Sequence, residues 1–188
     1  MDKILRMFLR FTEGSYSFTY KALSLIPGTI IFLGITPLLL FFLSRYLGSF
    51  IPLIWPRNLE IIIALTALSL ALFLMSWSLI ALWTTGQGTP APIAPTRKLV
   101  TTGPYAFCRN PMEVGTAAYF LFVGSWFDSL ITGILCLLFG LILGCGYIKL
   151  IEERELKLRF GQEYEEYRSM TPLFLLSFSC RRQKGHGC

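Results

Sequence analysis

Two polar clusters interrupt a largely apolar chain, and both hold side chains that bind polar ligands. Residues 103–115 read GPYAFCRNPMEVG and bring Arg109, Asn110 and Glu113 close together. Residues 151–167 read IEERELKLRFGQEYEEY and contain the adjacent carboxylates Glu152 and Glu153. A guanidinium binds carboxylate or phosphate, and a carboxylate accepts hydrogen bonds from hydroxyl or ammonium groups. If the clusters meet in space, they would suit one ligand with an anionic end and a part that carries hydroxyls or an amine.

The first cluster also has a purely structural explanation, as the start of a helix. Asn110 is favourable just before a helix, Pro111 is favoured at the first helical position, and Glu113 at the third completes a capping-box pattern. Arg109 is left over, because a cation in front of a helix opposes the helix dipole unless an anion joins it there. Arg109 is therefore either a ligand for a carboxylate or phosphate, or a cation that marks the cytoplasmic membrane surface.

The second cluster predicts a charged helix whose ion pairs account for part of its acidic residues. At the four-residue spacing of helical ion pairs, Glu153 can bind Lys157. Glu155 can bind Arg159 in the same way. Glu152 has no such partner and heads an apolar, aromatic stripe on the helix. The stripe consists of Leu156, Phe160, Tyr164 and Tyr167. This pattern predicts a site for hydroxyls or an ammonium group; S-adenosylmethionine fits both clusters, and nucleotide cofactors fit them nearly as well.

The composition is that of a membrane protein. Of the 188 residues, 54% are hydrophobic and 15% charged, against about 25% charged residues in soluble domains. Roughly 20 helical residues cross a bilayer. Four apolar runs have about this length: 22–44, 61–83, 111–127 and 129–148. We therefore predict one all-α domain, residues 1–188, that forms an integral membrane helical bundle of about four transmembrane helices in the lipid bilayer. Pro27 and Pro37 are expected to bend the first of them.

Two further segments are expected to lie at the membrane surface. Residues 1–21 alternate cations with apolar side chains, which predicts an interfacial helix. Residues 149–172 continue the last span as a C-terminal cytoplasmic extension of cofactor-binding helices, and Gly161 is placed to end the first of them. The proline-rich residues 84–102 form a longer connection than most loops, which favours a functional role.

The distribution of cations predicts the orientation. If both ends of the chain lie on one side, that side holds 15 of the 17 lysines and arginines, and only Arg45 and Arg57 lie opposite. The positive-inside rule then places both termini and the central loop in the cytoplasm, at the inner membrane of a bacterium or the endoplasmic reticulum of a eukaryote. The net charge of +6 follows from this asymmetry, so no nucleic-acid partner is expected. The five cysteines show no paired spacing, so we expect neither a metal site nor a disulfide.

The two clusters resemble the motifs of the membrane methyltransferases grouped with isoprenylcysteine carboxyl methyltransferase and the phospholipid methyltransferases. Members typically show G-x-Y-x-x-x-R-H-P-x-Y-x-G and, one helical hairpin later, E-E-x-x-L-x-x-x-F-G-x-x-Y-x-x-Y followed by a proline. The chain keeps every spacing of the second motif, and the resemblance covers residues 103–172. It departs from the first motif at two positions, where Asn110 replaces histidine and Glu113 replaces tyrosine.

The resemblance implies an enzyme that binds S-adenosylmethionine at the cytoplasmic membrane face and methylates a lipophilic or small thiol, carboxylate or amine acceptor. The cofactor-binding residues that it implies are Tyr105, Arg109, Asn110, Pro111, Met112, Gly115, Glu152, Glu153, Leu156, Phe160 and Tyr164. Arg109 and Glu152 are the candidate catalytic residues: Arg109 would hold a carboxylate of the cofactor or acceptor, and Glu152 would bind the cofactor's hydroxyls or amine. Glu153 would brace the helix or the cofactor. Residues 84–102 would act as a lid, and the pocket would be shaped by Tyr105, Phe160 and Tyr164.

Two other functions are compatible with the sequence. Membrane sterol reductases, which bind the nicotinamide cofactor NADPH in a related helical fold, carry a similar arginine-histidine-proline stretch. They usually have arginine where this chain has Glu152, which disfavours them. In a non-catalytic membrane subunit, both clusters would be only helix caps and surface ion pairs.

Overall fold

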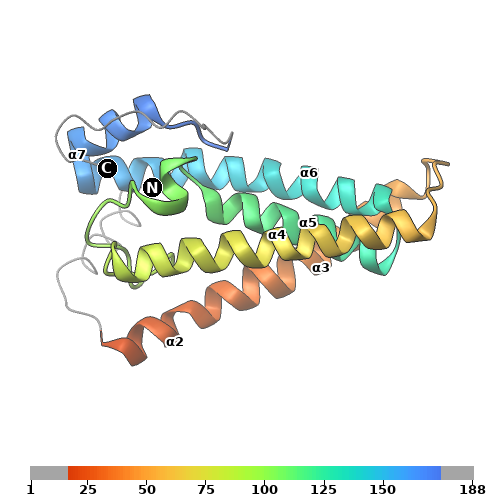
Figure 1. Cartoon of the computed structure of the whole chain (residues 1–188), viewed down its shortest axis with the longest axis horizontal. Helices are drawn as coiled ribbons and strands as arrows, with labels where there is room; N and C mark the ends of the chain where they lie inside the picture. Colours follow the sequence, from red (N-terminus) through yellow and green to blue (C-terminus); the bar gives the residue numbers. More distant parts are fainter. Residues whose placement is uncertain (1–16, 175–188) are drawn as a thin grey trace.

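The computed structural model describes residues 17–174, and every regular element among them is a helix. Figure 1 shows most of these helices running side by side along the long axis of the molecule. In chain order the elements are α2 (Phe18–Thr29), the π-helical segment η2 (Ile30–Ile35), α3 (Thr36–Gly48), α4 (Arg57–Thr84), the 3₁₀ turn η3 (Gly103–Ala106), α5 (Pro111–Phe127), α6 (Leu130–Tyr147), the π-helical segment η4 (Ile148–Glu152) and α7 (Glu153–Met170). The predicted all-α fold is confirmed.

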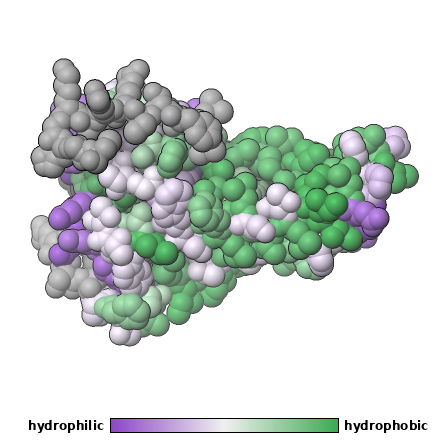
Figure 2. All heavy atoms as spheres, viewed as in Figure 1, coloured by the Kyte–Doolittle hydropathy of each residue, from purple (hydrophilic) through white to green (hydrophobic). Residues whose placement is uncertain are grey.

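Three helical stretches are long and apolar enough, by length and composition, to cross a membrane: Phe18–Gly48, Arg57–Thr84 and Leu130–Met170. α5 has the bounds predicted for the third span, and its 17 residues make about 26 Å of helix, close to the roughly 30 Å of a hydrocarbon core. Large apolar side chains are exposed over the outside of these helices, and Figure 2 shows them as a green band between two ends that carry hydrophilic residues. Such a surface is suited to lipid.

The last helical stretch is longer than a membrane is thick. Leu130–Met170 has 41 residues, about 61 Å of helix if it were straight, which is twice the hydrocarbon thickness. Its charged residues begin at Lys149, directly after α6. We infer that α6 is the membrane-spanning part and that η4 and α7 lie outside the hydrocarbon core.

α5 lies between α4 and α6 and packs against both. Small residues let helix backbones approach closely in membranes. At the crossing with α6, a Cβ atom added to Gly124 would lie only 2.5 Å from the Cα atom of Gly133. At the crossing with α4, a Cβ atom on Gly115 would lie 2.8 Å from the Cγ atom of Met75. These glycines therefore fix how close α5 comes to its two neighbours.

The first helix is irregular where its two prolines lie. Pro27 lies inside α2, Pro37 is in the first turn of α3, and the six residues of η2 between them are π-helical. Pro37 lacks the N–H group that would bond to the carbonyl of Leu33 in a regular α-helix. The hydroxyl of Tyr119, on α5, donates to that carbonyl at 3.1 Å. The prolines thus distort the first span, as expected, and a side chain of α5 satisfies the carbonyl group that Pro37 leaves free.

Charged residues fix the turns at the end of the bundle opposite α7 (Figure 1). The guanidinium of Arg57 donates to the carbonyls of Ser125 and Trp126, near the end of α5, at 3.1 and 2.6 Å. The buried carboxylate of Glu60 accepts the backbone N–H of Leu130, the first residue of α6, at 2.8 Å. Arg57 also pairs with Glu60 at 3.1 Å. These bonds tie the start of α4 to the α5–α6 turn.

The other end of the bundle gathers the connection between α4 and α5 together with α7 (Figure 1). Residues 84–102 are folded onto α2: the hydroxyl of Thr89 lies 3.3 Å from that of Ser24 and donates to the carbonyl of Ala94 at 3.0 Å. The lid role of this loop stays a prediction. So does the cytoplasmic orientation of this end. The interfacial helix predicted for residues 1–21 lies, up to residue 16, outside the described residues.

Candidate functional site

The start of α5 differs from the expected helix cap. Asn110 precedes α5 and Pro111 is its first residue, as predicted. Among the described residues, however, no side chain caps this helix. The amide of Asn110 donates instead to Oε2 of Glu152 at 3.1 Å. The capping-box prediction is therefore wrong, because a carboxylate 42 residues away in the chain takes the side chain that would have formed the cap.

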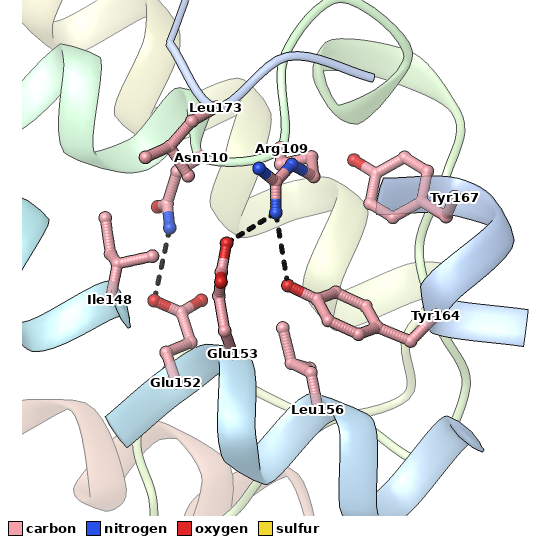
Figure 3. Close-up of a pocket in the computed structure, with 9 residues that line it drawn as sticks. All are labelled: Arg109, Asn110, Ile148, Glu152, Glu153, Leu156, Tyr164, Tyr167 and Leu173. Atoms are coloured by element: carbon pink, nitrogen blue, oxygen red, sulfur yellow. Dashed lines mark hydrogen bonds and ion pairs between the residues drawn. The ribbon is translucent and has the colours of Figure 1, made fainter. Parts of the chain in front are cut away.

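A π-helical segment presents the two adjacent carboxylates. η4 lies between α6 and α7, and π-helical turns of this kind are frequent at functional sites. Glu152 is the last residue of η4 and Glu153 is the first of α7. In Figure 3 both side chains leave this helix in the direction of Arg109 and Asn110.

Arg109 is the centre of the cluster (Figure 3). Its Nη1 atom lies 2.6 Å from Oε1 of Glu153 and 3.4 Å from the hydroxyl of Tyr164, and its Nε donates to the carbonyl of Thr171 at 2.9 Å. The side chains of Arg109 and Glu153 are 13% and 12% exposed. Arg168 also reaches Glu153, at 3.2 Å. The two polar clusters of the sequence thus meet, as we expected.

The tyrosines of the predicted stripe reach the cluster because α7 is kinked at Gly161. The φ of Gly161 is 52° and its ψ is −123°, a conformation that glycine adopts without the strain other residues would meet. The predicted end of the first helical segment at this residue is confirmed. Beyond the kink, Tyr164 faces Arg109, and the hydroxyl of Tyr167 donates to the carbonyl of Tyr105 at 2.7 Å.

The chain that follows α7 covers the cluster. The backbone N–H of Arg109 donates to the carbonyl of Pro172 at 2.9 Å, and that of Asn110 donates to the carbonyl of Leu173 at 3.3 Å. With the bond from Arg109 to Thr171, three hydrogen bonds hold residues 171–173 against the start of α5. We call residues 171–173 the strap.

Nine residues enclose a cavity of about 20 Å³ at the centre of the cluster, which is room for one water molecule (Figure 3). Six of them are predicted site residues: Arg109, Asn110, Glu152, Glu153, Leu156 and Tyr164. A seventh, Tyr167, belongs to the predicted aromatic stripe. Sequence reasoning missed Ile148 and Leu173. Ile148 lies one helical turn before Glu152, so its spacing could have indicated it; no sequence signal shows that the strap brings Leu173 back.

The other five predicted cofactor residues lie outside the wall of this cavity: Tyr105, Pro111, Met112, Gly115 and Phe160. Gly115 faces Met75 of α4, where it permits close helix packing. The ring of Phe160 lies under the guanidinium of Arg159, 4.9 Å from it. The roles of these five residues in cofactor binding stay predictions.

One of the two ion pairs predicted within α7 is confirmed and the other is wrong. Arg159 pairs with Glu155 at 2.9 Å, four residues away. Glu153 pairs with Arg109 and not with Lys157. Lys157 reaches across the kink to Glu165, at 2.7 Å.

Comparison with known proteins identifies the family. The model of the phospholipid methyltransferase family matches residues 59–163, which is more than half of the chain. The chain belongs to the phospholipid methyltransferase family. The match confirms the family suggested by the motifs, and it includes Arg109, Asn110 and both carboxylates of the cluster. No curated protein and no solved structure matches the chain. Together, the family and the apolar helices identify an integral membrane protein of a methyltransferase family.

Methyltransferases of this family generally use S-adenosylmethionine, so the cluster can be compared with that molecule. A guanidinium, a carboxylate and an aromatic, apolar wall match the carboxylate, the hydroxyls and amine, and the adenine of that molecule. A cavity of about 20 Å³ is too small to admit it. Because Glu153 holds Arg109 and the strap covers the cluster, a molecule of that size could enter only if this ion pair and the strap moved apart.

Burial influences the protonation of the cluster. Burial raises the pKa of Glu152 above its ordinary value, and the hydrogen bond from Asn110 opposes that rise. Burial also raises the pKa of Tyr164 and of Tyr167, so both phenols keep their protons at neutral pH. Burial raises the pKa of the Cys108 thiol, which disfavours a reactive thiolate there.

Within residues 17–174, no group of three or more histidine, cysteine, aspartate or glutamate side chains is placed to hold a metal ion.

Proposed function

We propose that this member of the phospholipid methyltransferase family transfers a methyl group from S-adenosylmethionine to a lipophilic acceptor at the cytoplasmic membrane face. The observation that carries the proposal is the meeting of the two polar clusters. Arg109 and Glu153 are 44 residues apart in the chain and Asn110 and Glu152 are 42 apart, yet bonds of 2.6 and 3.1 Å join them. An acceptor thiol, carboxylate or amine on an apolar chain, as in isoprenylcysteine carboxyl methyltransferase, would reach such a site from the lipid.

The proposed roles follow from the chemistry of each side chain. Arg109 would hold a carboxylate, because its guanidinium can make two parallel hydrogen bonds to such a group. Glu152, fixed by Asn110, would accept hydrogen bonds from hydroxyls or an amine. Tyr164 would offer its protonated hydroxyl and its ring face. When bound, S-adenosylmethionine supplies a methyl group already activated by a positively charged sulfur, so the protein mainly provides alignment and protection from water.

Glu153 would exchange partners when the ligand binds. It occupies the guanidinium of Arg109, which we assign to a ligand carboxylate. Arg168, whose side chain is more exposed, also contacts Glu153 at 3.2 Å and would remain its partner. Glu153 would thus brace α7 through one arginine while the other binds the ligand.

The test is calorimetric titration of the purified protein in mild detergent with S-adenosylmethionine and, separately, with NADPH. We expect heat from S-adenosylmethionine only, and at least tenfold weaker binding, about 1.4 kcal/mol, in Arg109→Ala and in Glu152→Gln. Arg45→Ala, at the far end of the bundle, and Glu163→Gln, exposed on α7, are matched controls that should bind like the parent.

Each other outcome has its own meaning. If both site variants bind S-adenosylmethionine like the parent, the site assignment is wrong. Heat from NADPH alone would favour a sterol-reductase-like enzyme, and heat from neither ligand would favour a non-catalytic membrane subunit.

A further inference from the structure

Glu113 lines a second, larger cavity, one helical turn along α5 from Asn110. This cavity, of about 210 Å³, lies between the first membrane helix and helices α5 and α6. Glu113 is the only charged residue among the described residues that line it. The first motif of the family typically has tyrosine at this position, so the negative charge is a property of this chain and not of the motif.

Glu113 has no hydrogen-bond or ion-pair partner among the residues that the structure describes. Its carboxylate packs against Gly144 of α6, where an added Cβ atom would collide with it. A carboxylate in apolar surroundings without a partner is costly, and charged residues of this kind in membrane helices commonly mark a ligand site. A bound molecule with a positive charge would supply the missing partner.

The large cavity is next to the cluster that we assign to the methyl donor. Asn110 lines the small cavity and Glu113 the large one, and on the facing helix Ile148 lines the small cavity and Tyr147 the large one. The carboxylates of Glu113 and Glu152 are close enough to repel each other. A cation between the two carboxylates would be attracted by both, whereas an anion would be repelled by both.

The aromatic lining of the large cavity also favours positive charge. Phe32 and Tyr147 line it, and their rings meet edge to face with centroids 6.4 Å apart. The faces of aromatic rings attract cations. No lysine or arginine is among the described residues that line this cavity. The surroundings of Glu113 therefore suit a positively charged group.

The positively charged sulfur of S-adenosylmethionine is the group for which the small cluster leaves no carboxylate. The proposed roles give Arg109 the carboxylate of that molecule and give Glu152 its hydroxyls or its amine. The sulfur carries the methyl group, which needs open space where an acceptor can approach. The small cavity measures only about 20 Å³, whereas the large one offers such space beside it.

We propose that Glu113 compensates the positive charge of this sulfur and makes the site selective for the charged methyl donor over its neutral product, S-adenosylhomocysteine. This inference rests on the proposed function and adds a specificity-determining residue to it. Without its methyl group the sulfur is a neutral thioether, because it keeps the electron pair of the broken carbon–sulfur bond. Glu113 then again lacks a compensating charge, which favours exchange of the spent cofactor for a new one.

The test compares three ligands that differ at the sulfur position. Purified full-length protein in a neutral detergent is titrated calorimetrically with S-adenosylmethionine, with S-adenosylhomocysteine and with sinefungin, in which a carbon bearing a primary amine replaces the methylated sulfur. At neutral pH the first and the third ligand are positively charged at this position, and the second is neutral there. We expect both charged ligands to bind at least tenfold more tightly than S-adenosylhomocysteine, a difference of about 1.4 kcal/mol.

Glu113→Gln removes the charge and keeps the shape of the side chain. All three ligands should then bind about equally, because the charged ligands lose affinity while S-adenosylhomocysteine keeps its own. Glu163→Gln, on the exposed face of α7, is the matched control and should keep the preference of the parent. Gly144→Ala is a second variant at the site, because its methyl group would displace the Glu113 carboxylate and should reduce the preference as well.

Thermal unfolding in the same detergent shows whether each variant is folded. Equal affinity of the parent for S-adenosylmethionine and S-adenosylhomocysteine would overturn the proposal, and so would an unchanged preference in a folded Glu113→Gln. If Glu113→Gln does not fold, the parent and Gly144→Ala decide: an unchanged preference in a folded Gly144→Ala would then overturn it.

The two proposals fail in different ways. If the parent binds none of the three ligands, the proposed function fails and this inference fails with it. If the parent binds S-adenosylmethionine and S-adenosylhomocysteine equally well, only the role of Glu113 fails and the proposed function stands.

Discussion

The Arg109–Glu153 ion pair joins the start of α5 to α7, and a double-mutant cycle can measure how strongly. The cycle consists of Arg109→Ala, Glu153→Ala and the double variant. If the pair organises the cluster, the two single substitutions should be strongly coupled. If both residues are merely solvated charges that lie close together, the costs of the two substitutions should simply add.

The expected magnitude follows from burial. Breaking a buried pair by removing one partner costs about 3–5 kcal/mol, whereas an exposed pair contributes about 0.2–1 kcal/mol. Both side chains are nearly buried, but Arg109 keeps the carbonyl of Thr171 and Glu153 keeps Arg168. We therefore expect each single substitution to lower the free energy of unfolding by about 2–3 kcal/mol, with a coupling energy of about 1.5–2.5 kcal/mol.

Lys157 and Glu165 form a control pair on the same helix. Their N–O distance, 2.7 Å, nearly equals the 2.6 Å of the Arg109–Glu153 pair, but their side chains are 63% and 32% exposed. The same cycle on this pair should give a coupling energy below about 1 kcal/mol. Unfolding is followed by tryptophan fluorescence as a denaturing detergent is titrated into mild-detergent micelles. A coupling energy for Arg109 and Glu153 no larger than that of the control pair would refute the reasoning.

Two further predictions concern packing and orientation. Gly124→Ala should destabilise the bundle by about 1–3 kcal/mol, because α5 and α6 must separate to admit the methyl group. Gly28→Ala is the control, since no heavy atom lies within 4 Å of the new Cβ atom. It should stabilise the bundle by about 0.5–1 kcal/mol. Equal effects in the same unfolding assay would contradict the close crossing. In intact cells, a membrane-impermeant maleimide should label Ile54→Cys from outside and Lys98→Cys only after permeabilisation, each as a single cysteine. Both positions are exposed, and the reverse pattern would overturn the orientation.

The helices could be predicted from the sequence because the signals that set them are local. The third apolar run, opened by Pro111, gave the bounds of α5 to the residue, and Gly161 indicated the kink in α7. Helix ends outside the apolar runs were less predictable. α4 begins at Arg57, directly after Pro56 and four residues before the apolar run predicted at 61–83. The helix therefore includes polar residues that the run excludes.

The partners of the polar side chains could be predicted only where they are local. Glu155 binds Arg159 at helical spacing, as expected. Glu153 was expected to bind Lys157 at the same spacing, but the fold brings Arg109 to it. Spacing rules assume that the nearest residue of opposite charge along the chain is also the nearest in space. At a helix that packs against a distant segment, this assumption fails.

The residues that break local rules are the ones that line the two cavities, which is where such departures are expected in a functional protein. Asn110 does not cap α5 but binds Glu152, and Glu153 does not pair with Lys157 but with Arg109. Both partners are distant in the sequence. Glu113 does not form the predicted capping box, and its carboxylate has no hydrogen-bond or ion-pair partner among the described residues. A carboxylate in apolar surroundings needs a compensating group. Since the described chain does not supply one for Glu113, its carboxylate is more in need of an external partner than the side chains of Asn110 and Glu153.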